Sequence, residues 1–301
     1  MYYDEYIRVV ILNYNTAKYT INLISNLQQQ GYTGFEIVVV DNCSNASDYL
    51  FLVNSLPNSV HLVRSPMNGG YSAGNNLGFK YDSGKSIDYF LVLNSDLMID
   101  DIHLIKKLVD GFKQKSYKPI YATSPLVNTT YSRLPSHSQI QVRKLLNRFQ
   151  LFFLSFSVFK KLFSSVFNNY VYFSEIPFSN KYLFCDTING AAFMISRPFL
   201  ESNSYLDEHV FLYHEELILG KQIQNAGGVC LLNGHAEVAH LQGISTKSTP
   251  NQFNWGMERQ KYLSEAYFFA EYLQMNKLII KIFCILKEME LYLKKLILHR
   301  I

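Results

Sequence analysis

The sequence predicts an α/β fold in which a mostly parallel central sheet is flanked by helices. Three observations lead to this prediction. Apolar runs at residues 9–12, 35–40 and 89–93 each end abruptly in polar residues, as buried strands do. The run at 89–93 is apolar throughout, which is typical of a strand covered on both faces of a parallel sheet. The segment 16–30 carries apolar residues at helical spacing between the first two runs, so the three segments read as a βαβ unit.

The segments after this unit extend the predicted sheet and add a glycine-rich stretch. The second strand ends in Asp41-Asn42, a short strand is expected at 60–63, and the glycine-rich stretch follows at 68–78. Glycines there can let the backbone approach a ligand closely, and the start of the following helix can offer free amide groups to a phosphate. The spacing is not the dinucleotide-binding GxGxxG, and the stretch follows the third strand rather than the first. The alternative is a glycine-rich turn that binds nothing.

The strand at 89–93 ends in Asn94-Ser95-Asp96. In open α/β sheets, ligands bind just beyond the carboxyl ends of the strands. The Asp96 carboxylate is therefore well sited to hold a metal ion bound to phosphate oxygens. The competing interpretation is that Asn94 and Asp96 only form a turn or cap the next helix.

Later segments continue the pattern of strands and helices. We expect helices at 102–112 and from residue 214 to the glycines at 227–228, and strands at 120–125 and 236–239. The aromatic segment 149–173 indicates an amphipathic helix or a hairpin that packs on the protein, with contact to a membrane surface as the alternative. Small residues at 190–192 precede an apolar strand, and they leave room either for a ligand or for close packing.

Two acidic residues and a histidine in this region are candidates for chemistry. Glu215 and Glu216 lie at the start of the predicted helix, where adjacent side chains diverge by about 100° and cannot both point at one reacting atom. One is a candidate general base, and the other positions it or caps the helix. His240 follows the strand at 236–239, and its neutral imidazole can complete the coordination of a divalent ion, although a lone histidine is more often structural.

The tail from Trp255 to Ile301 is helical in pattern, with lysines between apolar residues. It contains eight Lys or Arg and five Asp or Glu, so it carries +3 of the net charge of +4. An apolar stripe with lysines suits the surface of an anionic bilayer. Helix packing or homodimerisation is the other interpretation.

Composition argues against several classes of protein. The 301 residues suffice for one large α/β domain or two modest ones, and 48% hydrophobic residues support a substantial core. The mild charge, the scattered basic residues and the lack of a recognised motif argue against nucleic acid binding. Four separated cysteines favour a reducing cytoplasm, and the amino terminus lacks the basic region of an export signal. The region 151–173 is interrupted by Lys160 and Lys161, so it does not form a membrane span.

The ordered set of these motifs resembles the inverting family-two glycosyltransferases with the GT-A fold, particularly their rhamnosyltransferase-like branch. The resemblance covers residues 7 to 246, and it rests on the order of the pieces rather than on any single one. The matching pieces are Val10-Ile-Leu-Asn-Tyr-Asn15, Val40-Asp-Asn-Cys-Ser44, Asn68-Gly-Gly-Tyr-Ser-Ala-Gly-Asn-Asn76, Leu93-Asn-Ser-Asp96, Asn189-Gly-Ala-Ala192, Phe211-Leu-Tyr-His-Glu-Glu216, and His240 with Ser245.

The resemblance assigns roles to the residues at matching positions. Asp41 matches the acid that recognises the pyrimidine base, and Asp96 matches the last acid of the DxD element, which binds Mg²⁺ or Mn²⁺ on the diphosphate. His240 matches a histidine that can join the metal site. Glu216 falls where such enzymes carry the general base, and Glu215 remains the second candidate. The residues implied to bind the nucleotide-sugar are Asn13, Asn15, Asp41, Asn42, Gly74, Asn75, Asn94, Asp96 and Gly190.

The chemistry of sugar transfer agrees with these roles. The donor leaves as a nucleoside diphosphate, so a metal ion is needed to neutralise the developing phosphate charge. A carboxylate takes the proton from the acceptor hydroxyl as it attacks the anomeric carbon from the opposite face. Direct displacement of this kind inverts the anomeric configuration.

The sequence departs from the family pattern at four positions. Asn94 replaces the first acid of the DxD element, which leaves Asp96 as the only charged ligand from that turn. Ala46 and Ile218 stand where the family often has an acid. Glu216 stands where the base is usually Asp, so the choice between it and its neighbour stays open.

We therefore expect a GT-A glycosyltransferase domain at 1–250 with a variable aromatic-rich insertion at 128–180, and a helical extension at 251–301. The expected activity is metal-dependent, inverting transfer of a hexose from a dTDP- or UDP-sugar to a glycan or lipid-linked saccharide, during synthesis of cell envelope polysaccharide. The expected location is the cytoplasm, with peripheral contact to the inner face of the cell membrane left open. The alternative is a non-catalytic partner subunit that binds sugar nucleotides. A nucleotidyltransferase is disfavoured because its basic glycine-rich loop would follow the first strand.

Overall fold

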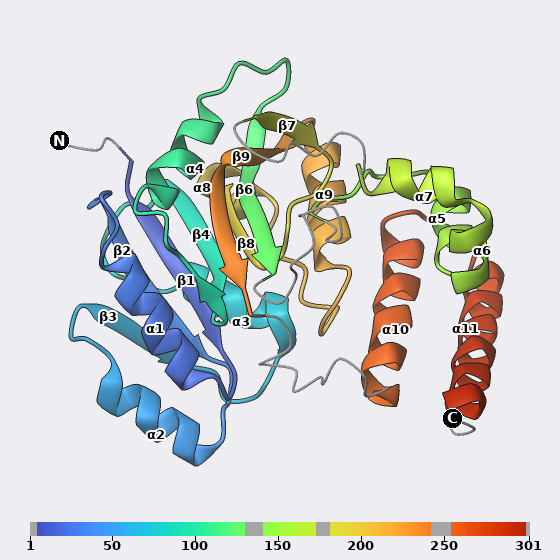
Figure 1. Ribbon diagram of the computed structural model, residues 1–301, viewed down its shortest axis with the longest axis horizontal. Helices are drawn as coiled ribbons and strands as arrows, with labels where there is room; N and C mark the ends of the chain where they lie inside the picture. The colour runs from blue at the N-terminus through green and yellow to red at the C-terminus, as the bar shows by residue number, and fades with distance from the viewer. Residues whose placement is uncertain (1–4, 130–140, 173–180, 242–253, 299–301) are drawn as a thin grey trace.

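The computed structural model describes residues 5–129, 141–172, 181–241 and 254–298 (Figure 1). Parts of the predicted insertion 128–180, and Ser245 of the family motif, lie outside these residues. The strands are β1 (Ile7–Asn13), β2 (Phe35–Asp41), β3 (Val60–Arg64), β4 (Tyr89–Asn94), β5 (Leu97–Met98), β6 (Ile120–Thr129), β7 (Tyr182–Cys185), β8 (Ala192–Ser196) and β9 (Val229–His240). The helices are α1 (Ala17–Leu27), α2 (Ala46–Ser55), α3 (Gly70–Phe79), α4 (Leu104–Phe112), α5 (Arg148–Leu154), α6 (Ser157–Leu162), α7 (Ser164–Tyr170), α8 (Arg197–Ser202), α9 (Glu215–Asn225), α10 (Trp255–Glu271) and α11 (Lys277–Leu298).

The described strands form one nine-stranded sheet in the order β3-β2-β1-β4-β8-β6-β9-β5, with β7 paired to β9. The pairs among β1, β2, β3 and β4 are parallel, and so is the pair of β6 and β9. β8 runs antiparallel between β4 and β6, and β5 and β7 are antiparallel to β9. The predicted α/β fold is confirmed, and the second half of the sheet is mixed.

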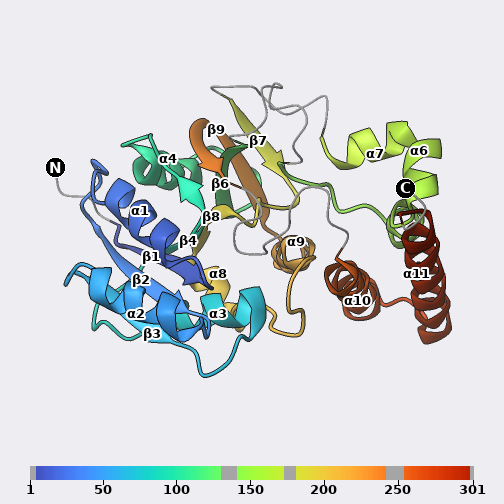
Figure 2. The same ribbon diagram turned by 60° about the horizontal axis from the view of Figure 1, so that its bottom comes forward.

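Two hydrophobic cores cover the two faces of the sheet. Alternate residues of β4 enter opposite cores: Leu91 and Leu93 pack into one, and Phe90 and Val92 into the other. Figure 2 shows α1 and α4 on one side of the sheet and α3 and α8 on the other. This burial on both faces explains why the strand is apolar throughout, because a strand with one wet face would alternate apolar and polar residues.

A third hydrophobic cluster joins the C-terminal helices to the rest of the protein. α10 and α11 pack with α5 around Phe268, Phe269 and Phe283, all fully buried. Leu217 and Ile218 of α9 belong to the same cluster. Figure 1 shows α10 and α11 standing beyond α9, away from the sheet. The cluster therefore connects these helices to the helix that begins with the two candidate bases.

Several local elements differ from the sequence-based expectation. The glycine-rich stretch is itself helix α3 rather than a loop before a helix. Its glycines let the helix lie close on β1, because a Cβ on Gly74 or Gly78 would collide with Leu12 or Val10. The aromatic segment 149–173 forms three short helices, α5 to α7, within its described part. β9 is much longer than the predicted strand at 236–239, and the short elements β5, β7 and α8 were not predicted.

No helix among the described residues has both the length and the apolar character that a membrane crossing requires. The four cysteines are all free thiols, two of them fully enclosed in the core at Cys185 and Cys230.

Candidate functional site

A cavity of about 1270 Å³ opens beside the carboxyl ends of β1 and β4 and extends to helices α5 to α7, α10 and α11. Its lining includes seven of the residues predicted from the sequence: Asn42, Asn94, Asp96, Gly190, Glu215, Glu216 and His240. The other five predicted residues are described by the structure and lie outside the lining: Asn13, Asn15, Asp41, Gly74 and Asn75. The cavity thus brings together the candidate metal ligands and both candidate bases.

Asn13 and Asp41 form a buried polar network where β1 and β2 end. Asn13 Nδ2 donates to Asp41 Oδ1 at 3.0 Å and to Ser44 Oγ at 3.1 Å, and both residues are fully buried. The Arg64 guanidinium lies 3.6 Å from Asp41 Oδ2. Asn15 has a positive φ of 58°. This network braces the turns that carry Asn42 to the cavity wall.

Asn75 and Gly74 lie within α3, behind the wall of the cavity. A Cβ on Gly74 would lie 2.4 Å from Leu12 Cδ1, so glycine lets the helix sit close on β1. Asn75 Nδ2 donates to the Tyr71 carbonyl at 3.0 Å, while its Oδ1 is buried without a partner among the described residues. Their assignment to the nucleotide-sugar stays a prediction.

Asp96 and His240 meet because β5 pairs antiparallel with the end of β9. The ladder sets Leu97 opposite His240, and His240 Nε2 then lies 3.0 Å from Asp96 Oδ1. Asp96 is 2% exposed, and both residues line the cavity. Among the described residues, no group of three or more His, Cys, Asp or Glu is placed to hold a metal ion.

Two protein ligands nevertheless suit a hard divalent ion that shares a diphosphate. Mg²⁺ is usually bound through one or two carboxylates plus substrate phosphates, rather than by an all-protein cage. A carboxylate oxygen such as that of Asp96 suits Mn²⁺, and the neutral imidazole nitrogen is the commonest metal ligand in proteins. The pair therefore fits such an ion, with the substrate supplying the other oxygens.

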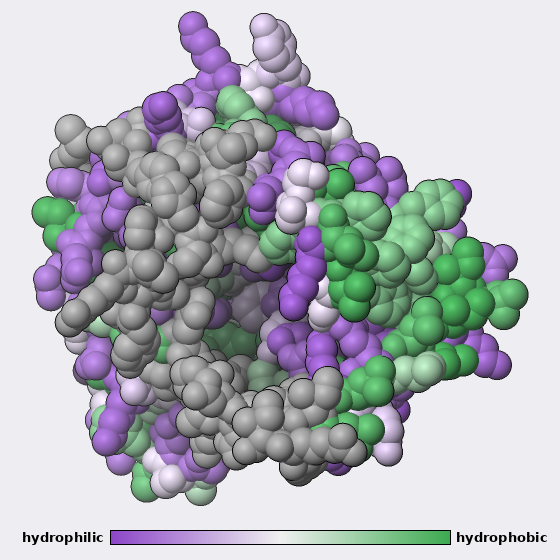
Figure 3. Space-filling model, turned by 45° about the vertical axis from the view of Figure 1, so that its right-hand side comes forward, coloured by the Kyte–Doolittle hydropathy of each residue, from purple (hydrophilic) through white to green (hydrophobic). Residues whose placement is uncertain are grey.

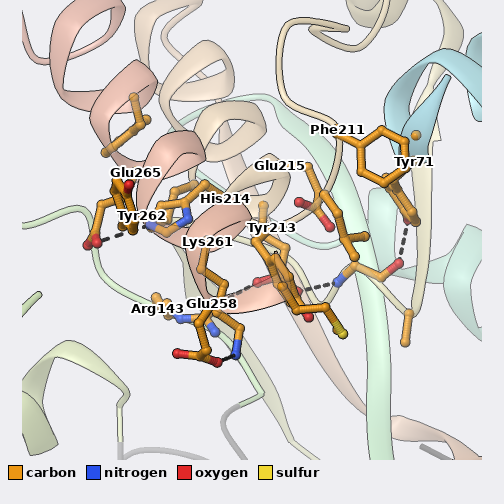
Figure 4. Close-up of a pocket in the computed structure, with 18 of the residues that line it drawn as sticks. Tyr71, Arg143, Phe211, Tyr213, His214, Glu215, Glu258, Lys261, Tyr262 and Glu265 are labelled. Carbon is orange, nitrogen blue, oxygen red and sulfur yellow. Dashed lines mark hydrogen bonds and ion pairs between the residues drawn. The ribbon is translucent and has the colours of Figure 1, made fainter. Parts of the chain in front are cut away.

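Glu216 is held at the cavity by contacts to both of its carboxylate oxygens. The Gly190 amide donates to Oε1 at 2.8 Å, and Arg143 Nη1 pairs with Oε2. On the other side of Gly190, the Tyr71 hydroxyl donates to the Gly190 carbonyl. Figure 4 shows this hydrogen-bonded chain with Tyr71 at one end and Arg143 at the other. The chain fixes the carboxylate between α9 and the segment before β8.

Glu215 has different surroundings, although it is the adjacent residue. Its Oε2 is enclosed and has no hydrogen-bond partner among the described residues. Burial, and then the neighbouring Glu216 carboxylate, raise the pKa of Glu215 to about 7. Burial is also the largest cause of the raised pKa of Tyr71, followed by Coulomb repulsion from the two glutamates. Glu215 is therefore a carboxyl group poised to change its charge near neutral pH.

The start of α9 has a strained backbone. Tyr213 and His214 both have positive φ, at 71° and 68°, which is uncommon for residues other than glycine. The Tyr71 amide donates to the Phe211 carbonyl at 2.9 Å, so the loop before α9 is tied to the start of α3. Strain of this kind is often found at functional sites, where surrounding contacts hold it in place.

Sequence reasoning did not assign Tyr71 or Arg143 to the site. Both backbone groups of Arg143 bond to the Thr187 hydroxyl, at 2.7 and 3.2 Å, and this places its guanidinium at Glu216. The ion pair between Arg143 and Glu216 joins residues that are 73 positions apart in the sequence. The only available signal was a run of basic residues beginning at Arg143, which does not indicate a partner.

Comparisons with known proteins agree on one family. The family described as glycosyl transferase family 2 matches residues 8–196 of the chain. The low-salt glycan biosynthesis hexosyltransferase Agl10 of Haloferax volcanii is 27% identical over 210 residues, which are 69% of this chain and 58% of that protein. The glycosyltransferase GlyG of Streptococcus pneumoniae serotype 4 is 26% identical over 114 residues, 37% of this chain and 36% of that protein. The chain thus matches little more than half the length of the first relative and about a third of the second.

Solved structures share the GT-A fold at low sequence identity. The mannosyltransferase PcManGT of Pyrobaculum calidifontis, in complex with GDP-Man and Mn²⁺, has a TM-score of 0.55 at 12% identity, covering 91% of this chain and 66% of that one. GalNAc-T7 with UDP, GalNAc and Mn²⁺ has a TM-score of 0.57 at 17% identity, covering 89% of this chain and 49% of that one.

Proposed function

The chain belongs to glycosyl transferase family 2, and we propose that it transfers a sugar from a nucleotide-sugar donor to an acceptor hydroxyl. One observation carries the proposal: a single cavity is lined by the pair of Asp96 and His240 and by the carboxylate of Glu216. Sugar transfer needs a site for the diphosphate and a base for the acceptor, and these side chains are candidates for both.

At the donor end, Asp96 and His240 are the residues that would hold Mg²⁺ or Mn²⁺. Such an ion neutralises the charge that develops on the departing diphosphate. The related folds of PcManGT and GalNAc-T7 were solved with Mn²⁺ and a nucleotide or nucleotide-sugar, which supports this assignment. The resemblance of Asp41 to the pyrimidine-recognising acid favours a UDP- or dTDP-sugar.

At the acceptor end, we assign the general base to Glu216. Its carboxylate is fixed at the cavity wall by the Gly190 amide and Arg143, and each oxygen keeps a lone pair for a substrate hydroxyl. Glu215 also lines the cavity and has the pKa near 7 that favours base catalysis. Its Oε2 is enclosed without a partner, however, and among the described residues no contact fixes its carboxylate as the Gly190 amide and Arg143 fix that of Glu216. In this assignment Glu215 contributes to the charge of the site and does not itself take the proton from the acceptor hydroxyl.

The remaining features of the reaction follow from this assignment. A base on the acceptor side and a departing diphosphate on the other describe a direct displacement, which inverts the anomeric centre. The acceptor is proposed to be a glycan or a lipid-linked saccharide in glycan biosynthesis, in keeping with the hexosyltransferase of Haloferax volcanii. For a lipid-linked acceptor, peripheral contact with a membrane is part of the proposal, with homodimerisation through the C-terminal helices as the alternative.

The proposal is tested by incubating the protein with a panel of UDP- and dTDP-sugars and measuring released nucleoside diphosphate. Release should require Mg²⁺ or Mn²⁺ and stop with EDTA. Asp96→Ala removes the only carboxylate of the proposed metal pair, so it should abolish the metal-stimulated part of the activity. His240→Ala should raise the metal concentration needed for half-maximal activity by about tenfold or more.

Two outcomes would contradict the proposal. Full metal-stimulated activity in Asp96→Ala would remove the metal assignment. Binding of a nucleotide-sugar without release of nucleoside diphosphate under any condition would favour the non-catalytic partner subunit instead.

A further inference from the structure

The outer face of α11 exposes a long apolar stripe. Its exposed residues recur every three or four positions, so they fall on one side of the helix, opposite to the buried Phe283 and Leu291. At 1.5 Å per residue the stripe is about 27 Å long. The exposed apolar residues of α11 are Leu278, Ile279, Ile282, Ile285, Leu286, Met289, Tyr292, Leu293 and Leu296.

Helices α5 and α6 add exposed apolar residues beside this stripe. Ser157 at the start of α6 bonds to Glu290 of α11, at 2.6 Å between the two side chains, so the helices are adjacent. The exposed apolar residues here are Phe149, Phe153, Val158, Leu162 and Phe163. Figure 3 brings this side of the molecule forward and shows hydrophobic side chains gathered in one broad patch beside a hollow. An apolar surface of this extent is unusual for a protein that faces only water.

The charges around the patch are cationic. Both carboxylates of α11 contact another helix: Glu288 accepts from Arg259 of α10 at 3.0 Å, and Glu290 accepts from the Ser157 hydroxyl of α6 at 2.6 Å. Lys277 and Lys281 are exposed and have no carboxylate partner among the described residues. Residues 141–172, which include α5 to α7, contain five Lys or Arg and no acidic residue.

We propose that the outer face of α11, together with α5 and α6, docks on an anionic lipid bilayer. An amphipathic helix of this kind lies in the plane of the interface, with its apolar stripe among the lipid tails and its lysines at the headgroups. Anionic headgroups attract each nearby lysine, and the two acids of α11 are already engaged by Arg259 and Ser157. A second copy of the chain fits less well, because two such faces would bring their lysines together.

The proposed docking surface lies next to the cavity. Lys160 of α6 lines the cavity and lies between the exposed Val158 and Leu162 of the patch. A bilayer on this surface would therefore lie next to the wall of the cavity. The inference rests on the proposed function only here, since a lipid-linked acceptor could then enter from the membrane.

Co-sedimentation of the full chain with vesicles tests the docking surface without any donor or acceptor. Vesicles of phosphatidylcholine alone are compared with vesicles that also contain phosphatidylglycerol, at low and high salt. We expect binding to the anionic vesicles at low salt, weakened by salt. The double variant Ile285→Gln with Met289→Gln should bind at least about tenfold less. Lys277→Gln with Lys281→Gln should weaken binding to anionic vesicles by about tenfold.

The matched control is Leu50→Gln with Val53→Gln on α2, which removes exposed apolar residues from a different surface. This control should bind as the wild type does, and thermal unfolding should be unchanged in every variant because all the sites are exposed. The proposal is overturned if the wild type binds neither kind of vesicle or if the α2 control loses binding equally. It is also overturned if sedimentation equilibrium shows that the wild type is a dimer and that Ile285→Gln with Met289→Gln is a monomer. Because no sugar transfer is measured, failure here is distinct from failure of the proposed enzymatic function.

Discussion

Glu215 and Glu216 are neighbours in the sequence, and their carboxylates have opposite surroundings. Glu216 accepts from an amide and pairs with a guanidinium, whereas Glu215 keeps an enclosed oxygen without a partner. Both lie in the first turn of α9, where the helix dipole favours negative charge. The difference between them therefore comes from burial and from Arg143, not from the helix.

Replacing Glu215 with Gln should stabilise the protein in a way that depends on pH. Its pKa is raised from 4.5 to about 7 in the folded protein, so the unfolded chain loses this proton first as pH rises. The free energy of unfolding therefore falls between these two pH values, and the cost is complete above pH 7. Glu215→Gln removes that cost, and its midpoint of thermal unfolding should exceed the wild-type value at pH 8 by about 2–5 °C.

The comparison at pH 4 is the control for this prediction, because pH 4 lies below both pKa values and Glu215 is then largely protonated in the folded and the unfolded wild type. The two proteins should melt at nearly the same temperature there. An equal difference at both pH values would mean that the substitution acts through packing and not through charge.

The sequence could identify the side chains of the site more readily than their contacts. Asp96, Glu216 and His240 each follow a recognisable strand or begin a helix, and the structure brings them to one cavity. The ion pair of Arg143 with Glu216 could not be predicted, because it depends on how a long intervening segment folds back onto α9. Asn13 and Asp41 were expected to bind the nucleotide. In the structure they belong to a buried hydrogen-bonded network beside the cavity.

The contact between α3 and the loop before α9 depends on one glycine. Gly70 has a φ of +88°, and a Cβ at this position would lie 2.2 Å from the Phe211 carbonyl oxygen. The same carbonyl accepts the Tyr71 amide. Any side chain at Gly70 would therefore push the loop away from α3 and disturb the start of α9.

Gly70→Ala should lower the free energy of unfolding by about 2–4 kcal/mol, measured by urea denaturation. Gly84→Ala is the matched control, because Gly84 also has a positive φ, at +72°, but nothing lies within 4 Å of its Cβ position. The control should cost only about 1 kcal/mol, from backbone strain alone. Equal losses in the two variants would show that the Phe211 contact adds nothing.

Among the elements, the parallel strands of the first half of the sheet were predicted well, and several later strands less well. Strands β1, β2 and β4 are buried on both faces, and this leaves a clear apolar run in the sequence. β5 has two residues, too few to leave any pattern, yet its pairing with β9 is what brings His240 to Asp96. The contact between His240 and Asp96 could therefore not be predicted from the sequence, because it depends on this short strand.

The whole molecule combines a GT-A fold with helices that extend its cavity. The family resemblance predicted the order of the motifs and the fold, because those depend on residues that recur along the chain. It did not predict the third hydrophobic cluster, in which α5, α9, α10 and α11 meet. The cavity wall on that side includes residues of this cluster and its surroundings, and those that come from α9, α10 and α11 lie beyond the residues 8–196 that the family match covers.

The most direct test of the account measures acceptor-dependent turnover and donor binding in Glu216→Gln and Glu215→Gln. We predict that Glu216→Gln lowers kcat by about 10²- to 10⁴-fold, because the acceptor hydroxyl loses its base. Donor binding should change little, since the proposed site of the diphosphate is at the Asp96 end of the cavity. Glu215→Gln should keep much of its turnover. Wild-type turnover in Glu216→Gln, or loss of turnover in Glu215→Gln alone, would contradict the assignment of Glu216 as the base.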